Sequence, residues 1–351
     1  MSLSTAEAIQ AHKRHWGRKL VILGHHYQYD EIIEHTDIAG DSLELARKIP
    51  EQKAEHIVFC GVDFMAETAA ILAHSNQHVY MPDTSASCVM ADMAPAPLVG
   101  HILEQLHREG KRVIPLAYVN SSAAIKALCG EFGGSVCTSA NAATMLRWAF
   151  HQGDQVLFLP DQHLGVNTAR QIGLGEHQWH TLNIRSRGAQ LDTRAINAAQ
   201  LLLWPGLCAV HAKFHLQNVA TIRRHDPQAT ILVHPECHPD VVQAADGAGS
   251  TSFLISYAAR AKPGTRLYIG TECNLVYRLQ RQYQETLSIA PLRVSACSNM
   301  GKTTATKLAN VVERLPHAPV MAVDPKIQSP ALVALQRMLE ACSPAADKEK
   351  A

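Results

Sequence analysis

Three cysteines, Cys88, Cys208 and Cys297, each follow a predicted buried strand, in segments that look like variations on one repeating unit. Thiolates so distant in sequence meet only if the fold brings three equivalent strand ends to one point. Three sulfurs at one point form an incomplete tetrahedral site, and its missing ligand position is open to a substrate. We therefore expect a metal centre with three thiolate ligands.

The remaining cysteines give a weaker signal. The chain has nine in all and no C-x-x-C pair, which argues against zinc ribbons, thioredoxin-type sites and the usual ferredoxin spacing. Three lie within or beside apolar runs and are interpreted as packing residues: Cys60, Cys137 and Cys273. Three have no counterpart in the other repeats: Cys129, Cys342 and Cys237, of which Cys237 is of interest because it follows His234-Pro-Glu.

Further polar side chains gather where predicted strands end or the next helices begin. Those at strand ends are His25, Tyr27, Tyr118, Asn120, His211, His234 and Glu236. Each alone is more often a satisfied hydrogen-bonding residue than a catalyst, but their recurrence at one sheet edge favours a function. Helices begin near Ser42, Ser139 and Thr251, where hydroxyl and free N–H groups can hold a carboxylate or phosphate, or simply cap the helix.

The elements that position these residues form an α/β alternation that occurs three times. Continuous apolar runs, typical of parallel strands covered on both faces, lie at 19–27, 56–62, 78–82, 112–120, 135–139, 155–161, 229–234 and 266–272, and 292–297 closes the pattern. Ligands of open α/β sheets bind at the carboxyl ends of the strands. A single barrel would also gather strand ends at one face, but about nine strands and the threefold cysteine spacing favour three small units.

These patterns predict the domain bounds. We expect a first αβα unit over 1–105, a second over 106–204 with an inserted segment near 176–203, and a third over 205–299. Helices within 300–345 are expected to pack on the first unit, before a charged tail. Pro82-Asp83 and Pro160-Asp161 are matched as equivalent positions of the first two units.

Composition narrows the class of protein. The chain has 351 residues, of which 47% are hydrophobic and 18% charged, as in a globular protein with two or three packed units. A net charge of +1 gives no indication of nucleic acid or an anionic membrane surface as partner. The start does not resemble a signal peptide and no apolar stretch is long enough to span a bilayer, so we expect a cytoplasmic location.

The ordered set of segments is similar to the quinolinate synthase (NadA) family. The resemblance covers about Leu20 to Glu313 and rests on residues 24–28, 40–43, 60–67, 82–88, 118–120, 137–142, 208–211, 234–237, 249–251, 270–272 and 297–300. It implies three αβα sandwich domains in pseudo-threefold arrangement around a central active site. It also implies a [4Fe-4S] cluster on three cysteines, matched here by Cys88, Cys208 and Cys297, with the fourth iron left for substrate.

The reaction implied by this resemblance condenses iminoaspartate with dihydroxyacetone phosphate to quinolinate, phosphate and water, in de novo NAD biosynthesis. An aspartate oxidase or dehydrogenase would supply the iminoaspartate. An open iron is a Lewis acid that helps a hydroxyl group leave as water, and proton removal beside a carbonyl needs a positioned base. Our catalytic candidates are Tyr27, Glu236 and His211, and the expected substrate-binding residues are His25, Ser42, Tyr118, Asn120, Ser139, His234 and Thr251.

Two other classes of function remain open from the residues. A zinc hydrolase could use part of the His/Cys/Glu set, although a local motif such as H-E-x-x-H is missing. A non-catalytic iron–sulfur sensor would need the cluster but leaves the expected pocket residues without purpose. The chain also departs from the family at 130–134, which looks like an insertion.

Overall fold

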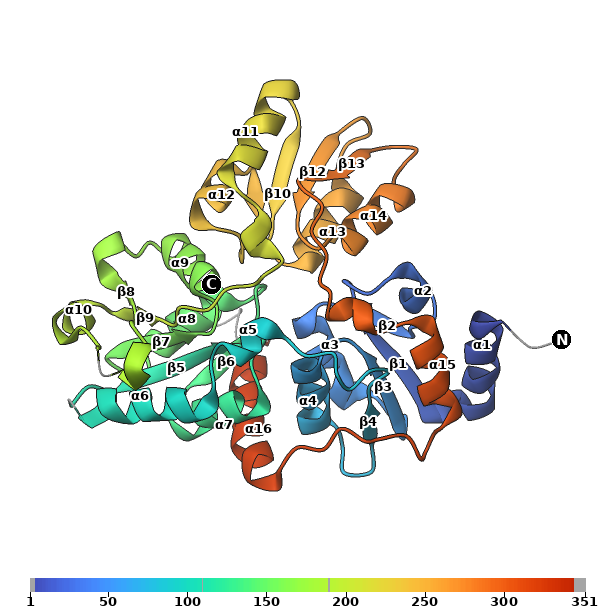
Figure 1. The fold of residues 1–351 in the computed structure, drawn as a ribbon, viewed down its shortest axis with the longest axis horizontal. Helices are drawn as coiled ribbons and strands as arrows, with labels where there is room; N and C mark the ends of the chain where they lie inside the picture. Colours follow the sequence, from blue (N-terminus) through green and yellow to red (C-terminus); the bar gives the residue numbers. More distant parts are fainter. Residues whose placement is uncertain (1–3, 109, 189, 344–351) are drawn as a thin grey trace. The chain divides into compact units, whose positions relative to one another are not determined.

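The computed structural model describes residues 4–108, 110–188 and 190–343, and its strands form three parallel sheets (Figure 1). The first sheet has the order β2-β1-β3-β4, with β1 Leu20–His25, β2 Ile38–Gly40, β3 His56–Cys60 and β4 His78–Tyr80. The second has the order β6-β5-β7-β9-β8, with β5 Val113–Tyr118, β6 Ser135–Cys137, β7 Gln155–Leu159, β8 Trp179–Thr181 and β9 Leu201–Leu203. The third has the order β11-β10-β12-β13, with β10 Thr230–Val233, β11 Gly247–Ala248, β12 Arg266–Gly270 and β13 Ser288–Pro291.

All three sheets repeat one topology. In each, the strand that comes second in the chain lies at one edge, followed by the first, the third and then β4, β9 or β13, which we call the fourth strand by its place in the sheet. In the second sheet, β8 precedes β9 in the chain and lies beyond it at the other edge. The threefold α/β alternation expected from the sequence is therefore confirmed, and so is the α/β fold class with parallel sheets. The predicted domain bounds and the pseudo-threefold arrangement around a centre stay predictions.

The helices follow the strands in alternation. They are α1 Thr5–Trp16, α2 Asp30–Ile33, α3 Ser42–Lys48, α4 Asp63–Leu72, α5 Val89–Asp92, α6 Ala96–Arg108, α7 Ala123–Glu131, α8 Ala142–Phe150, α9 Gln162–Gln171, α10 Thr193–Ala198, α11 Leu216–His225, α12 Pro239–Ala244, α13 Thr251–Arg260, α14 Cys273–Gln282, α15 Ala305–Glu313 and α16 Pro325–Ala341. None of these helices has both the length and the apolar character needed to cross a bilayer.

The described chain divides into two compact units. The first comprises residues 1–88, 220–232 and 250–323, and the second comprises 89–219, 233–249 and 324–351, apart from the positions outside the described ranges. In the first unit, α15 packs beside α1 against one face of the first sheet (Figure 1). Leu308, Val311 and Val312 of α15 recur at helical spacing and are buried with Ile22 and Val58 of the strands, as expected for an amphipathic helix.

In the second unit, α16 packs against α7 and β6. Ser135 Oγ donates a hydrogen bond to the carbonyl of Ala334 at 3.0 Å, and Arg337 donates to the carbonyl of Gly134 at 2.7 Å. The two helices approach so closely that a Cβ atom on Gly130 would lie 1.9 Å from the carbonyl oxygen of Pro330. Glycine is required there for lack of space, which gives the apparent insertion at 130–134 a packing role.

The C-terminal helices correct one expectation. Residues 300–345 were predicted to pack together on the first αβα unit, and α15 does so. However, α16 packs on the second sheet, while residues 344 and beyond lie outside the described ranges. Both helices are amphipathic, and the partner of an apolar face is decided by tertiary packing, which the spacing of apolar residues does not encode.

The segment near 176–203 was predicted to be an insertion, and only part of it is additional to the common sheet. Its last residues form β9, which occupies the same position in the second sheet as β4 and β13 do in theirs. The additional strand is β8, which pairs in parallel with β9 at the sheet edge. The two strands have three residues each, and of the two only β9, Leu201–Leu203, is apolar throughout.

Candidate active site

Two turns with the same hydrogen-bond pattern follow equivalent strands. After β1, the backbone N–H of Tyr27 donates to Nδ1 of His25 at 3.2 Å, and that of Gln28 donates to the His25 carbonyl at 3.0 Å. After β10, the N–H of Glu236 donates to Nδ1 of His234 at 3.3 Å, and that of Cys237 to the His234 carbonyl at 3.0 Å. An N–H group can only donate, so Nδ1 of each imidazole is the acceptor and a neutral ring carries its proton on Nε2.

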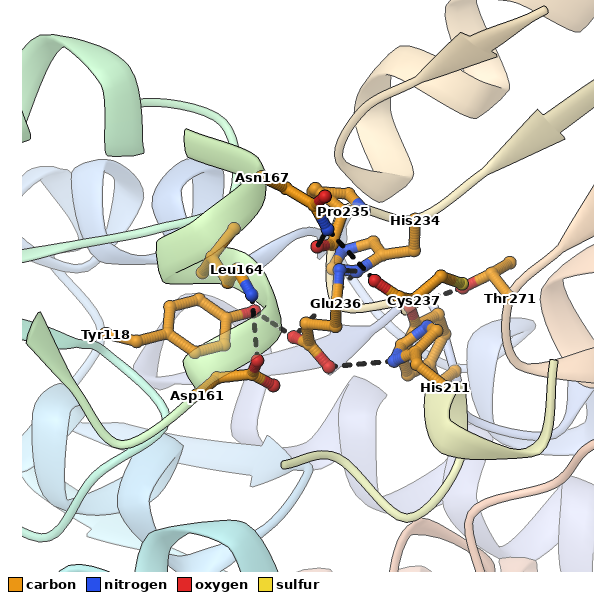
Figure 2. Close-up of polar contacts among 11 residues, drawn as sticks. Tyr118, Asp161, Leu164, Asn167, His211, His234, Pro235, Glu236, Cys237 and Thr271 are labelled. Carbon is orange, nitrogen blue, oxygen red and sulfur yellow. Dashed lines mark hydrogen bonds and ion pairs between the residues drawn. The ribbon is translucent and has the colours of Figure 1, made fainter. Parts of the chain in front are cut away.

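Glu236 is the centre of a buried polar cluster (Figure 2). The hydroxyl of Tyr118, at the end of β5, donates to Oε1 of Glu236 at 2.5 Å. Nδ1 of His211 lies 2.7 Å from Oε2, and the ring of His211 stacks on that of His234 with 4.5 Å between centroids. The structure thus brings together four residues predicted for the site: Tyr118, His211, His234 and Glu236.

The environment of this cluster separates the protonation states of its acids. Burial by itself raises the pKa of Glu236, but interactions with His211, His234 and Tyr118 outweigh it and hold the pKa well below its usual range. Burial and the nearby charge of Glu236 raise the pKa of Asp161 well above its usual range. Burial lowers the pKa of His234 to about 3. Near pH 7 the cluster therefore holds an ionised Glu236 and a neutral His234, while Asp161 gives up its proton less readily than an ordinary aspartic acid.

Cys208 lies beside this cluster on a tightly held loop. The loop begins at the fully buried Trp204, whose indole N–H donates to the carbonyl of Met93 at 2.7 Å. Gly206 exchanges backbone hydrogen bonds with the segment after β7, where a Cβ atom would lie 2.5 Å from the carbonyl oxygen of Pro160. As a result, one ligand atom each of Cys208, His211 and Glu236 lie within 4.8 Å of one another.

Tyr27 has its own surroundings in the first unit. Its hydroxyl group lies 2.6 Å from Oγ1 of Thr271, at the end of β12, and its ring packs edge-on against His25 with centroids 4.7 Å apart. Tyr27 is half-buried, whereas His25 and Thr271 are buried. The tyrosine is thus fixed both at its backbone turn and at its hydroxyl.

The predicted helix-start residues follow the second strand of each sheet. Ser42 and Thr251 are the first residues of α3 and α13, and the capping is done by their neighbours Asp41 and Ser250. Ser139 follows β6, and two residues separate it from Ala142, the first residue of α8. The caps of both helices are thus supplied by other side chains, and Oγ1 of Thr251 has no hydrogen-bond partner among the described residues.

The three predicted ligand cysteines occupy equivalent places in the topology. Cys88, Cys208 and Cys297 each come five to eight residues after the fourth strand of a sheet. Each also stands at the start of a helical turn: Cys88 directly precedes α5, and the carbonyls of Cys208 and Cys297 accept i+4 hydrogen bonds at 2.9 and 3.1 Å. All three thiols are half-buried.

Most of the other cysteines are poorly suited to bind metal. Five are buried: Cys60, Cys129, Cys137, Cys237 and Cys273. Burial raises the pKa of all five, that of Cys129 to about 12, so they are held as neutral thiols. Cys342 directly follows α16 and is half-buried. Its Sγ lies 3.7 Å from Sδ of Met145 on α8. The donor chemistry therefore fits a thiolate-bound group at the three predicted cysteines.

Sequence reasoning missed two buried acids that contact the cysteine loops. Asp161 caps α9 and Glu272 caps α14, each after the third strand of its sheet. The backbone amide of Cys208 interacts with Asp161, and that of Cys297 donates to Oε1 of Glu272 at 3.4 Å. Burial raises the pKa of Glu272 to about 7.

The match of Pro82-Asp83 with Pro160-Asp161 was wrong. Pro82-Asp83 follows β4, the fourth strand of the first sheet, whereas Pro160-Asp161 follows β7, the third strand of the second. The proper counterpart of Asp161 is Glu272, and the signal for it was its position directly after an apolar run. Local dipeptides repeat by chance, whereas strand order decides which positions are equivalent.

The fold and the site together define an α/β protein with polar clusters at the strand ends of three like sheets, the arrangement of an enzyme built on parallel sheets. The sequence profile of the NadA family, described as "Quinolinate synthetase A protein", matches residues 7–340. The chain belongs to this family.

Individual relatives agree with this assignment. The chain is 43% identical over 341 residues to a quinolinate synthase of Halalkalibacterium halodurans, which covers 95% of this chain and 92% of that protein. It is 42% identical over 340 residues to a quinolinate synthase of Streptomyces coelicolor, covering 94% and 86%. It is 44% identical over 330 residues to one of Corynebacterium glutamicum, covering 92% and 84%.

Proposed function

We propose that this protein is a quinolinate synthase of de novo NAD biosynthesis. It condenses iminoaspartate with dihydroxyacetone phosphate and releases quinolinate, phosphate and water. Family membership along nearly the whole chain supports the activity. The structural observation that carries the proposal is the proximity of the half-buried Cys208 to the buried His211 and Glu236, since a predicted cluster ligand then lies beside two predicted catalytic residues.

The three half-buried thiols of Cys88, Cys208 and Cys297 would hold a [4Fe-4S] cluster. When bound, such a cluster with one iron free of protein ligands supplies a Lewis acid. Support comes from the equivalent positions of the three cysteines after the fourth strands and from their helical turns, whose N–H groups favour a thiolate.

Glu236 and His211 act as one proton-transfer unit. Nδ1 of His211 lies in hydrogen-bond contact with Oε2 of the ionised Glu236, so the carboxylate charge would balance a proton that the imidazole exchanges with substrate. Tyr118 holds the other carboxylate oxygen and so prevents the carboxylate from turning. Tyr27 supplies a second proton-transfer group, because its hydroxyl is held at Thr271 and is positioned by a turn of the same geometry.

The remaining site residues bind the anionic groups of the substrates. His25 and His234 each present an Nε2–H donor, suited to a carboxylate or phosphate. Asn120 Oδ1 and Thr251 Oγ1 are buried and have no hydrogen-bond partner among the described residues. Buried polar atoms are nearly always paired in folded proteins, so these two oxygens are suited to polar groups of a ligand. Ser42 and Ser139 complete the binding set.

The partners of the protein are therefore small molecules, with iminoaspartate arriving from an aspartate oxidase or dehydrogenase. A cytoplasmic location follows from this role and from the need to keep the thiols reduced. Nothing in its charge calls for nucleic acid or a membrane surface as partner.

Anaerobic purification followed by metal analysis and turnover tests the proposal. We expect a brown protein with about four irons per chain that forms quinolinate from iminoaspartate and dihydroxyacetone phosphate. Cys208→Ser should lose both iron and turnover, while the matched control Cys342→Ser keeps both. Iron with no turnover would instead favour the sensor, and one zinc per chain would favour the hydrolase.

A further inference from the structure

Two helices that follow third strands, α14 and α9, carry side chains that donate hydrogen bonds to the turns after β1 and β10. On α14, Nη1 of Arg278 donates to the carbonyl of His26 at 2.9 Å, and Nη2 donates to that of Gln28 at 2.6 Å. These two carbonyls belong to the residues on either side of Tyr27. Arg278 therefore holds both peptide groups that flank this tyrosine.

The same arrangement occurs in the second unit around Glu236. Nδ2 of Asn167, on α9, donates to the carbonyl of Pro235 at 2.8 Å and to that of Cys237 at 2.9 Å (Figure 2). These are the residues on either side of Glu236. The side-chain amide of Asn167 thus donates to both carbonyls that flank Glu236, as the guanidinium of Arg278 donates to both carbonyls that flank Tyr27.

The two donors also occupy equivalent positions. Asn167 lies six residues after Asp161, the N-cap of α9, and Arg278 lies six residues after Glu272, the N-cap of α14. Both helices follow the third strand of a sheet, and the two turns that accept their hydrogen bonds both follow the first strand of a sheet. Two chemically different side chains at one topological position make the same pair of contacts, which indicates a constraint on the turn and not a chance contact.

We propose that Asn167 and Arg278 are positioning residues for the reaction, each fixing the backbone of one proton-transfer residue, Glu236 and Tyr27 respectively. The proposal rests on the proposed function, because it takes these two residues as the proton-transfer groups. A proton transfer needs donor and acceptor within hydrogen-bond reach, and small misplacements of such groups cost large factors in rate.

The supporting contacts differ between the turns and allow sharp controls. Arg278 also donates from Nε to Asp30. Asn274 donates to the Tyr27 carbonyl at 3.1 Å, so this turn keeps one side-chain hydrogen bond when Arg278 is replaced. Arg281 binds the same Asp30 from α14 but does not reach the carbonyls that flank Tyr27. On α9, Arg170 pairs with the exposed Glu176 and serves as the control for Asn167.

The test measures steady-state kinetics, quinolinate binding and amide hydrogen exchange on anaerobically reconstituted protein. For Asn167→Ala we expect kcat to fall about 10- to 100-fold with KM and quinolinate affinity within about threefold. Exchange should accelerate at the amides of Glu236 and Cys237. Arg278→Ala should give a smaller loss of kcat and faster exchange at Tyr27 and Gln28, with Arg278→Lys in between. Arg281→Ala and Arg170→Ala should match the wild type.

Asn167→Ser, which keeps one donor, extends the test if Asn167→Ala does not fold. Unchanged kcat in the folded Asn167 and Arg278 variants, or unchanged exchange at both turns, overturns the positioning role while leaving the proposed function intact. If the wild type makes no quinolinate, the proposed function fails, and the exchange data still decide whether the two side chains hold the turns.

Discussion

At the residue scale, the site depends on how Glu236 is surrounded. Its carboxylate is buried, yet Tyr118 and His211 each satisfy one oxygen at 2.5 and 2.7 Å. In the neighbouring Asp161, which caps α9, burial and the charge of Glu236 outweigh the hydrogen bonds and raise the pKa well above its usual range. The contrast between these two acids gives one strongly oriented anion beside Cys208, which a catalytic site needs and a merely structural carboxylate does not.

Replacing Glu236 tests this role. Glu236→Gln keeps the shape but cannot accept hydrogen bonds at both positions from Tyr118 and His211, and it carries no charge. We expect kcat to fall by about 10²- to 10⁴-fold, the usual contribution of a general acid or base, while the iron content stays unchanged. The exposed Glu176→Gln should have no effect, and near-normal turnover of Glu236→Gln would remove the assigned role.

At the element scale, the tail helices secure the parts of the chain that carry function. Lys307 of α15 forms an ion pair with Asp83 at 2.5 Å, and Lys302 donates to the carbonyl of Ser85 at 2.6 Å. Both contacts fix the loop that leads to Cys88. The helix α15 therefore covers the first sheet and also restrains a cysteine-bearing loop.

The Asp83–Lys307 pair predicts a pH dependence of stability. The hydrogen bond from Lys307 lowers the pKa of Asp83 to about 2, so between about pH 4 and pH 2 the folded state binds fewer protons than the unfolded state. The stabilisation is complete above this window and is lost as the pH falls through it. At pH 7, Asp83→Asn should lower the free energy of unfolding by up to about 1 kcal/mol, because the pair is partly screened by solvent.

Urea unfolding of wild type and Asp83→Asn at several pH values measures this difference. The gap between the two proteins should shrink as the pH falls from about 4 toward about 2. The exposed Asp240→Asn is the control and should show no such trend. A gap that persists unchanged at the acid end would contradict the ion pair as its source.

The contact between α7 and α16 predicts a large effect of one methyl group. Gly130→Ala would place Cβ against the backbone carbonyl of Pro330, which cannot move away as a flexible side chain can. We expect the free energy of unfolding to fall by about 1–3 kcal/mol, as for other overpacked sites. Gly100→Ala on α6 would meet only the Leu128 side chain at 3.6 Å and should be neutral or slightly stabilising. Equal unfolding midpoints for the two variants would argue against the close approach.

At the scale of the whole molecule, three sheets with one strand order provide three equivalent loops after their fourth strands. The three cysteines proposed as ligands, Cys88, Cys208 and Cys297, lie one on each of these loops. The elements at the other strand ends carry the remaining site residues: His25, Tyr27, Tyr118, Asn120, His234 and Glu236. Repetition of one strand order thus gives polar residues far apart in the sequence equivalent places in their sheets.

If the three cysteines serve one cluster, their loss must be equivalent. Cys88→Ser and Cys297→Ser should each reduce the iron content as fully as Cys208→Ser, because a cluster that loses one of three protein ligands is poorly held. Iron analysis and the visible absorption of anaerobically reconstituted protein measure this, again with Cys342→Ser as control. Full iron retention in either variant would exclude that cysteine from the ligand set.

The sequence alone predicted the longer strands, the threefold alternation and the family. It placed the closing run at 292–297, whereas β13 is Ser288–Pro291. The strands β1, β5 and β7 can be recognised in the sequence as long apolar runs, because a strand that is buried on both faces needs continuous hydrophobic residues. The strands β2 and β11 escaped prediction because no longer apolar run surrounds their two or three residues, and β8 and β9 were counted with the inserted segment.

Tertiary structure alone decided which side chains touch. Asn167 reaches a carbonyl 70 residues away and Arg278 one 252 residues away, and no local pattern connects such positions. The placement of α16 on the second sheet and the pairing of Glu236 with Tyr118 and His211 were likewise hidden. Hydrophobic periodicity encodes that a face is covered, whereas its partner, and the hydrogen bonds that orient a catalytic group, depend on how the whole chain packs.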